Sequence, residues 1–269
     1  MSNELKSLDS LLDTHCCLYF QLPIKAARPL VTLNTSEQDG QMKSETISDV
    51  NSRAVYTRLV ETYGERDLTP RRDPLHELIS TILSQRTTWA NEELAYKRMW
   101  ERFGSWEGIR DAPEGELAKA IAPSNYPEVK APQIKRTLAQ IIEERGEAKI
   151  DFLKDLPVDE GLAWLTTLPG VGVKTAALVL LFCFSKPILP VDTHVYRVSQ
   201  RVGLISQKVK SSTAAHAPLT KLLPEDPHVL YNFHIALLLH GQQVCVWKAP
   251  KCATCPLTDM CNWYAENRT

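Results

Sequence analysis

The sequence predicts an all-α protein. From Ser52 onward, apolar residues recur at spacings of three and four, and no segment shows the sustained alternation of a half-buried strand. Glycines follow several of these apolar stripes, as they commonly do where helices end. The chain has 269 residues, of which 43% are hydrophobic, so it is large enough to bury one or two cores without disulfide bonds.

The stripes and the glycines predict the individual helices in order. The first five stripes are Val55–Tyr63, Leu75–Leu83, Ala95–Phe103, Leu117–Ile121 and Ile134–Ile142. The first, third and fifth of these predicted helices end at Gly64, Gly104 and Gly146. The later helices are expected over Val158–Leu168, Val173–Ser185, Thr193–Val202, Thr213–Leu223 and His228–Gly241. Since Val173–Ser185 is apolar on nearly every side, we expect it to be buried at the centre of the larger core.

The first fifty residues differ from the rest of the chain. They carry four basic and seven acidic residues, whereas the whole chain has a net charge of −1. The stretch Asn34–Asn51 is rich in Ser, Thr, Asn, Asp and Gly and has no apolar period. We interpret residues 1–51 as a flexible N-terminal extension, either regulatory or an incidental tail.

Composition also bears on the compartment. The longest apolar run, Ala176–Phe184, is far shorter than the ~20 residues that cross a membrane. The N-terminus lacks the basic and long apolar regions of a secretory signal. We therefore expect a monomeric cytoplasmic protein, in a bacterial cytosol or nucleoid, with no membrane partner. The weak net charge means that any nucleic-acid binding requires a local basic patch.

Four of the seven cysteines lie close together near the C-terminus. Their spacing is C-x6-C-x2-C-x5-C, at Cys245, Cys252, Cys255 and Cys261. Such a group can bind either tetrahedral zinc or a [4Fe–4S] cluster. Zinc sites usually pair two C-x2-C knuckles, and only one is present here, which favours the iron–sulfur cluster. Unrelated cysteines are the remaining alternative. Cys183 is expected to be an ordinary core residue, and no role is assigned to Cys16 or Cys17.

The segment LPGVGVKTA, residues 168–176, lies between two predicted helices. Gly170 and Gly172, on either side of Val171, permit a tight hairpin that larger side chains would obstruct. The backbone N–H groups at the start of the next helix form a potential anion site, which would contact phosphate without reading sequence. A simple turn is the alternative interpretation.

Lys174 and Asp192 are candidate catalytic residues. Lys174 falls in the first turn of the buried helix, where the helix dipole and apolar neighbours should both lower its pKa and free the amine for attack. Asp192 lies at a predicted helix N-cap, where the same dipole favours a carboxylate. An amine and a carboxylate together could break an N-glycosidic bond. The alternatives are a lysine that extends into solvent and an aspartate that only caps its helix.

In their order and spacing, these motifs resemble the endonuclease III family of helix–hairpin–helix DNA glycosylases. The resemblance rests on LPGVGVKTA, on VDTH at residues 191–194, whose aspartate follows the lysine by 18 residues, and on the four cysteines. It extends from about Ser52 to Tyr264. The resemblance implies two helical domains with a DNA-binding cleft between them. The domain with the helix–hairpin–helix motif, a six-helix block, is expected over residues 73–203, and the iron–sulfur domain over 52–72 plus 204–269.

The resemblance also implies roles and an activity. Lys174 matches the family's Schiff-base nucleophile, Asp192 its essential carboxylate, and the four cysteines its [4Fe–4S] ligands. The implied protein is a bifunctional DNA glycosylase and AP lyase of base excision repair. It would excise damaged pyrimidines, in particular oxidised ones, from double-stranded DNA and then cut the strand at the abasic site by β-elimination. Extrusion of the base costs a few kcal/mol, and least for a damaged base.

This chain departs from the family around the expected base pocket. Residues 84–89 read SQRTTW where many members carry Ala-Gln before Ala-Thr-Asp. The family's gap-filling glutamine aligns with Arg86, or with Gln85 if the register slips by one, and Trp89 replaces an aspartate. The wedge loop at residues 124–127 has Ser or Asn where a leucine is often found. Val173 replaces a basic residue beside the nucleophile, so one phosphate contact is expected to be missing.

The expected DNA contacts combine the hairpin, the pocket loops and basic residues near the cysteines. They are Gly170, Val171, Gly172, Gln85, Arg86, Asn125, His194, Lys248 and Lys251. Other basic residues, such as Arg197 and Arg201, are weaker candidates, because some charges on a helix simply face solvent. Binding through such a patch should depend on salt.

Four alternatives stay open at this stage. The adenine glycosylase branch shares the cluster and the aspartate but lacks a lysine at the position of Lys174. The plant-type 5-methylcytosine glycosylases share both but occur in much longer chains. A DNA-binding or electron-transfer iron–sulfur protein would need neither Lys174 nor Asp192. A monofunctional glycosylase with altered base specificity is a further variant of the enzyme interpretation.

Overall fold

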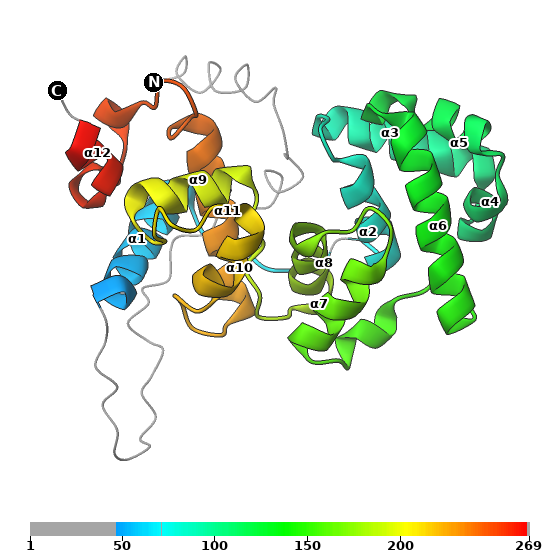
Figure 1. Ribbon diagram of the computed structural model, residues 1–269, viewed down its shortest axis with the longest axis horizontal. Helices are drawn as coiled ribbons and strands as arrows, with labels where there is room; N and C mark the ends of the chain where they lie inside the picture. Colours follow the sequence, from blue (N-terminus) through cyan, green and yellow to red (C-terminus); the bar gives the residue numbers. More distant parts are fainter. Residues whose placement is uncertain (1–46, 71, 268–269) are drawn as a thin grey trace. The chain divides into compact units, whose positions relative to one another are not determined.

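The computed structural model describes residues 47–70 and 72–267, which form α-helices and short 3₁₀ turns with no β-sheet among them (Figure 1). This confirms the all-α fold class. The chain divides into two compact units. In the described residues, the first unit is residues 70–184 and the second is residues 47–69 with 185–267. None of the described helices has both the length and the apolar character needed to span a membrane.

The first unit consists of helices α2 to α8, coloured cyan to green in Figure 1. Their bounds are α2 Pro74–Leu83, α3 Trp89–Phe103, α4 Trp106–Asp111, α5 Glu114–Ala120, α6 Pro127–Arg145, α7 Val158–Thr167 and α8 Val173–Phe184. Short 3₁₀ turns η5, Ala122–Ser124, and η6, Asp151–Lys154, precede α6 and α7.

Helix α8 is the centre of the first unit. Its residues from Thr175 to Phe182 are all buried, and it packs against α2 and α7. Gly161 of α7 leaves room for the Leu180 side chain of α8, because an added Cβ would lie 3.0 Å from Cδ2 of that leucine. The prediction that this apolar segment is buried is therefore confirmed.

Local sequence signals mark the ends of these helices. Asp73 caps α2 by accepting hydrogen bonds from the N–H groups of Leu75 and His76, and Thr88 and Ser105 cap α3 and α4 in the same way. Gly104 and Gly146 end α3 and α6 in the left-handed region, with φ of +72° and +78°.

The second unit combines the first described helix with the C-terminal part of the chain. Its helices are α1 Ile47–Tyr63, α9 Thr193–Val202, α10 Ser212–Thr220, α11 Pro227–Gln243 and α12 Asn262–Asn267. In the cysteine segment there are two 3₁₀ turns, η7 Cys252–Thr254 and η8 Thr258–Met260. Helix α11 is buried along most of its length and packs against both α1 and α9. The core of this unit includes Leu59, Val195, Val198, Leu230 and Phe233.

The structure differs from the sequence-based expectations at three places. Helix α1 begins at Ile47, inside the segment expected to be a linker. The rest of the proposed extension lies outside the described residues. Helix α9 belongs to the second unit, whereas we had placed it with the hairpin domain. The short helices α4 and α12 were not predicted, because α4 buries only Ile109 and α12 buries nothing.

Candidate active site and cysteine pocket

The hairpin between α7 and α8 is closed by backbone geometry and supported from α6. Gly170 has φ of +79°, and the N–H of Val171 donates to the carbonyl of Leu168 at 3.1 Å. From α6, the Thr137 hydroxyl donates to the carbonyl of Pro169 at 2.9 Å. A Cβ at Gly170 would lie 2.9 Å from the Gln133 amide oxygen, so glycine is required there for both conformation and space. The hairpin thus holds the start of α8 in place.

Lys174 is the second residue of α8 and is half-buried. Gly172, which precedes the helix, is exposed, and its carbonyl accepts the first helical hydrogen bond, from the N–H of Ala176 at 3.0 Å. The amine is therefore carried on a buried helix directly after a hairpin in which Gly172 is exposed and Val171 is buried. This is the placement that a nucleophile next to a phosphate-binding turn requires.

Two loops of the first unit lie beside this hairpin. The Gln85 side-chain amide donates to the carbonyl of Gly170 at 3.0 Å, and the Asn125 amide donates to the carbonyl of Arg86 at 3.0 Å. Arg86 and Asn125 are both exposed. The structure thus brings together, in one unit, the expected contacts Gln85, Arg86, Asn125 and the hairpin.

Asp192 is the N-cap of α9 in the second unit. One carboxylate oxygen, Oδ1, accepts from the N–H groups of His194 at 2.8 Å and Val195 at 2.7 Å. Both hydrogen bonds use Oδ1, so the orientation of the group is fixed while Oδ2 stays available. The capping role of Asp192 is confirmed, and it is compatible with a second, chemical role.

Two buried histidines hold the segment that leads to Asp192. His216 of α10 contacts the carbonyl of Leu189 through Nδ1 at 3.1 Å, and His234 of α11 contacts the carbonyl of Pro190 at 2.9 Å. The N–H of Leu189 donates to the Thr220 hydroxyl at 3.1 Å. The backbone before Asp192 is therefore anchored to two helices, which gives the carboxylate a rigid base.

His194 is engaged with another side chain of α9. Its Nδ1 lies 3.0 Å from Nη2 of Arg197, which also donates to the carbonyl of Gly241 at 2.7 Å. Nε of Arg197 donates to the carbonyl of Cys245 at 2.9 Å. Arg197 is only 8% exposed, so it is a structural link between α9, the end of α11 and the first cysteine. We had treated it as a weak candidate for DNA contact.

The four cysteines of the C-terminal motif line one pocket of the second unit, together with Arg201, His240 and Trp263. Arg201 donates to Sγ of Cys245 at 3.4 Å and to the carbonyls of Val246 and Trp247, both at 2.8 Å. No three Cys, His, Asp or Glu side chains in residues 47–70 and 72–267 are arranged to hold a single metal ion. The thiols surround a common space instead.

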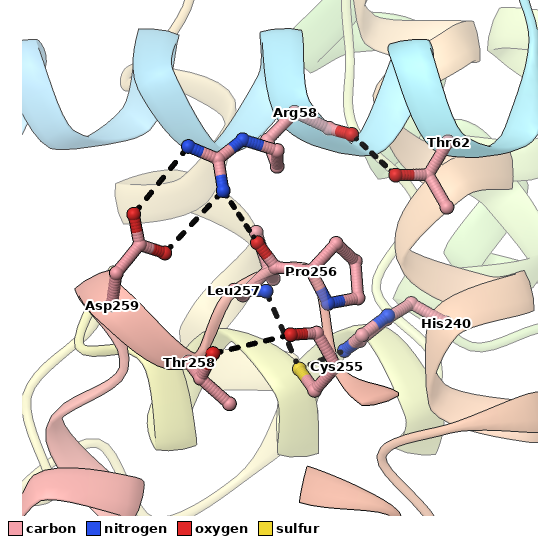
Figure 2. A network of polar contacts seen from close by, with 8 residues as sticks. All are labelled: Arg58, Thr62, His240, Cys255, Pro256, Leu257, Thr258 and Asp259. Carbon is pink, nitrogen blue, oxygen red and sulfur yellow. Dashed lines mark hydrogen bonds and ion pairs between the residues drawn. The ribbon is translucent and has the colours of Figure 1, made fainter. Parts of the chain in front are cut away.

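Cys255 receives the densest set of contacts (Figure 2). The N–H of Leu257 donates to its Sγ at 3.4 Å, and Nε2 of His240 lies 3.5 Å from the same sulfur. Nδ1 of His240 is 3.0 Å from the Tyr63 hydroxyl. Burial lowers the pKa of His240 to about 4 and raises the pKa of the Cys255 thiol to about 11. Burial therefore disfavours the thiolate form of Cys255, which a cationic centre would stabilise.

Helix α1 contacts the segment around Cys255 through Arg58. Nη1 of Arg58 donates to the carbonyl of Pro256 at 2.8 Å, and the guanidinium pairs with Asp259 at 3.4 Å (Figure 2). The pair with Asp259 is exposed and adds little stability, whereas the bond to the carbonyl fixes the backbone next to Cys255. This explains why a helix distant in sequence belongs to the cysteine unit.

The loop between Cys245 and Cys252 points side chains outward. Trp247 is 69% exposed, and Lys248 and Lys251 are exposed beside it. The two lysines were expected contacts for DNA, and their exposure is compatible with that role. Asp192, His194, both lysines and the cysteines all belong to the second unit, whereas Lys174 belongs to the first.

Comparison with known proteins agrees with these features. A sequence model described as "HhH-GPD superfamily base excision DNA repair protein" matches residues 79–225, more than half of the chain. Endonuclease III of Thermotoga maritima is 35% identical over 192 residues, which cover 71% of this chain and 84% of that protein. The chain belongs to the HhH-GPD superfamily of base excision DNA repair proteins.

Within this superfamily, the chain is an endonuclease III-like DNA glycosylase. A solved structure of a trapped endonuclease III–DNA covalent intermediate has a TM-score of 0.69 and 26% identity, covering 82% of this chain and 99% of that one. A thymine/uracil-DNA glycosylase of Pyrobaculum aerophilum is 30% identical over 76% of this chain and 87% of that protein. DNA binding and the family assignment agree with the expectation from the sequence motifs.

Sequence reasoning missed several residues that the fold places around these features. They are Lys130, His216, His234 and His240, whereas Arg197 and Arg201 were expected only as weak candidates for DNA contact. The two arginines and His240 lie next to motif residues, so proximity to the aspartate and cysteine motifs could have indicated them. Nothing in the sequence indicated that Lys130 is buried, because a single lysine on a long helix has the same pattern as a lysine that faces solvent.

Proposed function

We propose that this endonuclease III-like glycosylase is bifunctional and uses Lys174 as its nucleophile. The observation that carries this proposal is the position of Lys174, on the first turn of a buried helix directly after the hairpin. A solved structure similar to this chain is of a covalent endonuclease III–DNA intermediate, and covalent catalysis requires such a nucleophile.

The proposed reaction has two stages, removal of the base and cleavage of the strand. Nζ of Lys174 forms a bond to C1′ of the damaged nucleotide, and the glycosidic C1′–N bond breaks, so that the base leaves with the electron pair and gains a proton. The nitrogen then loses one proton, and its lone pair opens the C1′–O4′ bond, which leaves a protonated Schiff base at C1′ and an O4′ that takes up a proton. Loss of a proton from C2′ then expels the 3′ phosphate. Water hydrolyses the Schiff base and restores the amine.

Asp192 would act on the first of these steps. A carboxylate near C1′ stabilises the positive charge that develops on the sugar as the base leaves. The structure holds this group through two backbone N–H bonds to Oδ1, and the segment before it is anchored by His216 and His234. A carboxylate that is already oriented needs little reorganisation during the reaction.

The test is borohydride trapping on a duplex with one abasic site. Borohydride reduces a Schiff base to a stable amine, so the wild-type protein should become covalently bound to DNA. Lys174→Ala should lose the adduct and strand cleavage while still binding the duplex. Asp192→Asn should slow removal of a damaged base on the order of a hundredfold or more. Persistent trapping in Lys174→Ala would move the nucleophile to another residue.

We propose oxidised pyrimidines as the substrate class, with thymine or uracil as the second candidate. The second candidate is favoured by the similarity to the thymine/uracil-DNA glycosylase from P. aerophilum. A panel of duplexes with thymine glycol, dihydrouracil, uracil, 5-methylcytosine or adenine opposite 8-oxoguanine distinguishes these classes. Cleavage of thymine glycol and dihydrouracil supports the first, and excision of uracil alone supports the second.

We also propose that the cysteine pocket binds a [4Fe–4S] cluster through Cys245, Cys252, Cys255 and Cys261. The four thiols surround a shared space, and N–H donors from Arg201 and Leu257 point at two of the sulfurs. A cubane takes one thiolate on each iron, so its ligands stand further apart than those of a single ion. The cluster would supply the bonds that fix the loop carrying Lys248 and Lys251.

A further inference from the structure

Lys130 is a buried lysine with an unusual set of partners. It lies in the first turns of α6 and is 3% exposed. Nζ donates to three backbone carbonyls, those of Leu83 at 2.7 Å, Gln85 at 2.7 Å and Ser124 at 2.5 Å. Burial lowers the pKa of Lys130 to about 8, so at neutral pH the group is mainly an ammonium with three donors. A buried ammonium is costly, and these three bonds offset that cost.

The Leu83 carbonyl lies at the end of α2, and the other two lie in the loops that follow α2 and precede α6, both of which contain strained residues. Arg86 follows Gln85 directly and has φ of +55°, while Asn125 and Tyr126 follow Ser124 with φ of +60° and +52°. Non-glycine residues in this region cost of order 1–3 kcal/mol each and persist where surrounding contacts hold them. Lys130 supplies such contacts immediately before Arg86 and Asn125.

The two loops form one surface with the hairpin. The Asn125 amide donates to the Arg86 carbonyl, and the Arg86 guanidinium lies 5.7 Å from the centre of the Tyr126 ring. Gln85 joins the first loop to the carbonyl of Gly170. Tyr126 is 50% exposed, and Arg86 and Asn125 are exposed as well. An aromatic ring, a guanidinium and an amide are thereby presented next to the helix that carries Lys174.

We propose that Lys130 is a positioning residue for base recognition, because its ammonium holds both loops in the conformation that presents Arg86, Asn125 and Tyr126 to the DNA. The inference rests on the proposed function. Removing an intact base requires unstacking it, which costs a few kcal/mol, whereas an abasic site has no base to unstack. Loops that hold the duplex open are therefore needed more for base excision than for cleavage of a preformed abasic site.

The test compares two reactions of each variant under single-turnover conditions. One is release of the base from a duplex with the lesion that the wild type excises best, and the other is cleavage of the same duplex with an abasic site. The measured quantity is the ratio of the two rates. Lys130→Met keeps the length of the side chain but removes its donors. We expect this ratio to fall on the order of tenfold or more, because small misplacements at an active site cost up to ~100-fold.

Two further variants serve as a control on the same helix and as a conservative substitution of Lys130. Lys135→Met changes a lysine of the same helix, whose ammonium bonds the carbonyl of Ala112, and should leave the ratio at the wild-type value. Lys130→Arg keeps the charge but cannot place three donors at the same points, so the ratio should fall less than in Lys130→Met. If Lys130→Met does not fold, as judged by thermal melting, the ratio in Lys130→Arg decides.

The outcomes separate this inference from the proposed function. A lower ratio in the Lys130 variants, with Lys135→Met unchanged, supports the positioning role. Equal loss of both reactions would overturn it, because a purely structural role lowers both together. An unchanged ratio in both Lys130 variants would also overturn it. A wild-type protein that cleaves no abasic site would instead contradict the proposed lyase, whatever the variants do to base release.

Discussion

Buried or half-buried charged side chains that bind backbone carbonyls are the common feature of this protein at the scale of single residues. Lys130 binds three carbonyls in the first unit, and Arg197 and Arg201 bind carbonyls around Cys245 in the second. Each replaces a hydrogen bond that an irregular loop could not make within itself. The loops near the expected active site are therefore held by side chains from neighbouring helices.

His76 leads to a prediction about acid stability. Its ring stacks on Tyr96 with centroids 3.7 Å apart, and burial and the neighbouring Arg72 lower its pKa from 6.5 to about 4. Between pH 6.5 and 4 the unfolded chain binds a proton that the folded protein does not, so stability falls with decreasing pH. Above pH 6.5 both states are neutral at this group, and it adds no pH dependence.

His76→Phe should reduce the loss of unfolding free energy between pH 6.5 and 4, because phenylalanine keeps a ring against Tyr96 but cannot take up a proton. The measurement is urea unfolding of both proteins at pH 7, 5.5 and 4, and the compared quantity is the loss of unfolding free energy on acidification. A variant that loses as much stability as the wild type between pH 7 and 4 would show that His76 does not titrate in this range.

At the scale of elements, close helix approach sets the position of α9. Gly241 of α11 faces His194 of α9, and an added Cβ would lie 2.7 Å from the His194 Cβ and 3.2 Å from its Cα. The helix that begins at Asp192 thus packs directly on the backbone of α11. The first turn of α9, and with it the candidate catalytic carboxylate, is positioned by a residue with no side chain.

Gly241→Ala should push the first turn of α9 away from α11. We expect a loss of about 1–3 kcal/mol in the free energy of unfolding, as for other overpacked sites. We also expect slower base excision, because the shift displaces Asp192. Chemical denaturation and single-turnover excision measure the two effects.

Gly115→Ala in α5 is the matched control, since nothing lies within 4 Å of its added Cβ. Helix propensity should leave that variant as stable as the wild type, or more stable by up to about 1 kcal/mol. If Gly241→Ala also matches the wild type in stability, α9 and α11 must be able to separate without cost.

At the scale of the whole molecule, the two units carry different parts of the chemistry. Lys174 and the hairpin lie in the first unit, and Asp192 and the four cysteines lie in the second. The second unit takes α1 from far upstream in the chain and ties it to the cysteine segment through Arg58. A cofactor in the cysteine pocket would therefore stabilise the second unit, in which all of its protein ligands lie.

Iron analysis and iron removal test whether a cluster in the cysteine pocket stabilises the second unit. Protein purified without oxygen should contain about four iron atoms per chain, as one cubane requires. Removing the iron should lower hydrogen-exchange protection in α9 and α11, while α8 keeps its protection. Stoichiometric zinc would replace the cluster assignment with a zinc site. Equal loss of protection in α8 would mean that the two units depend on each other for stability.

Much of the fold could be predicted because local patterns carry it. The stripes around Leu75–Leu83 and Ile134–Ile142, the glycines at 104 and 146, and the apolar segment at the start of α8 all act over one or two helical turns. The family motifs likewise lie within short stretches, so their order along the chain was sufficient to identify the superfamily. Short helices such as α4 escaped because a single buried residue, Ile109, has no periodicity.

The sequence by itself determined the helices, the superfamily and the candidate residues Lys174, Asp192 and the four cysteines. Only the tertiary structure decided that α9 packs with α11, that Arg197 is buried and that Lys130 joins two loops. The physical reason is that helix periodicity and capping depend on neighbours within a few residues. A buried ion instead depends on partners from other segments, here about 45 residues from Lys130, which are brought to it only by packing.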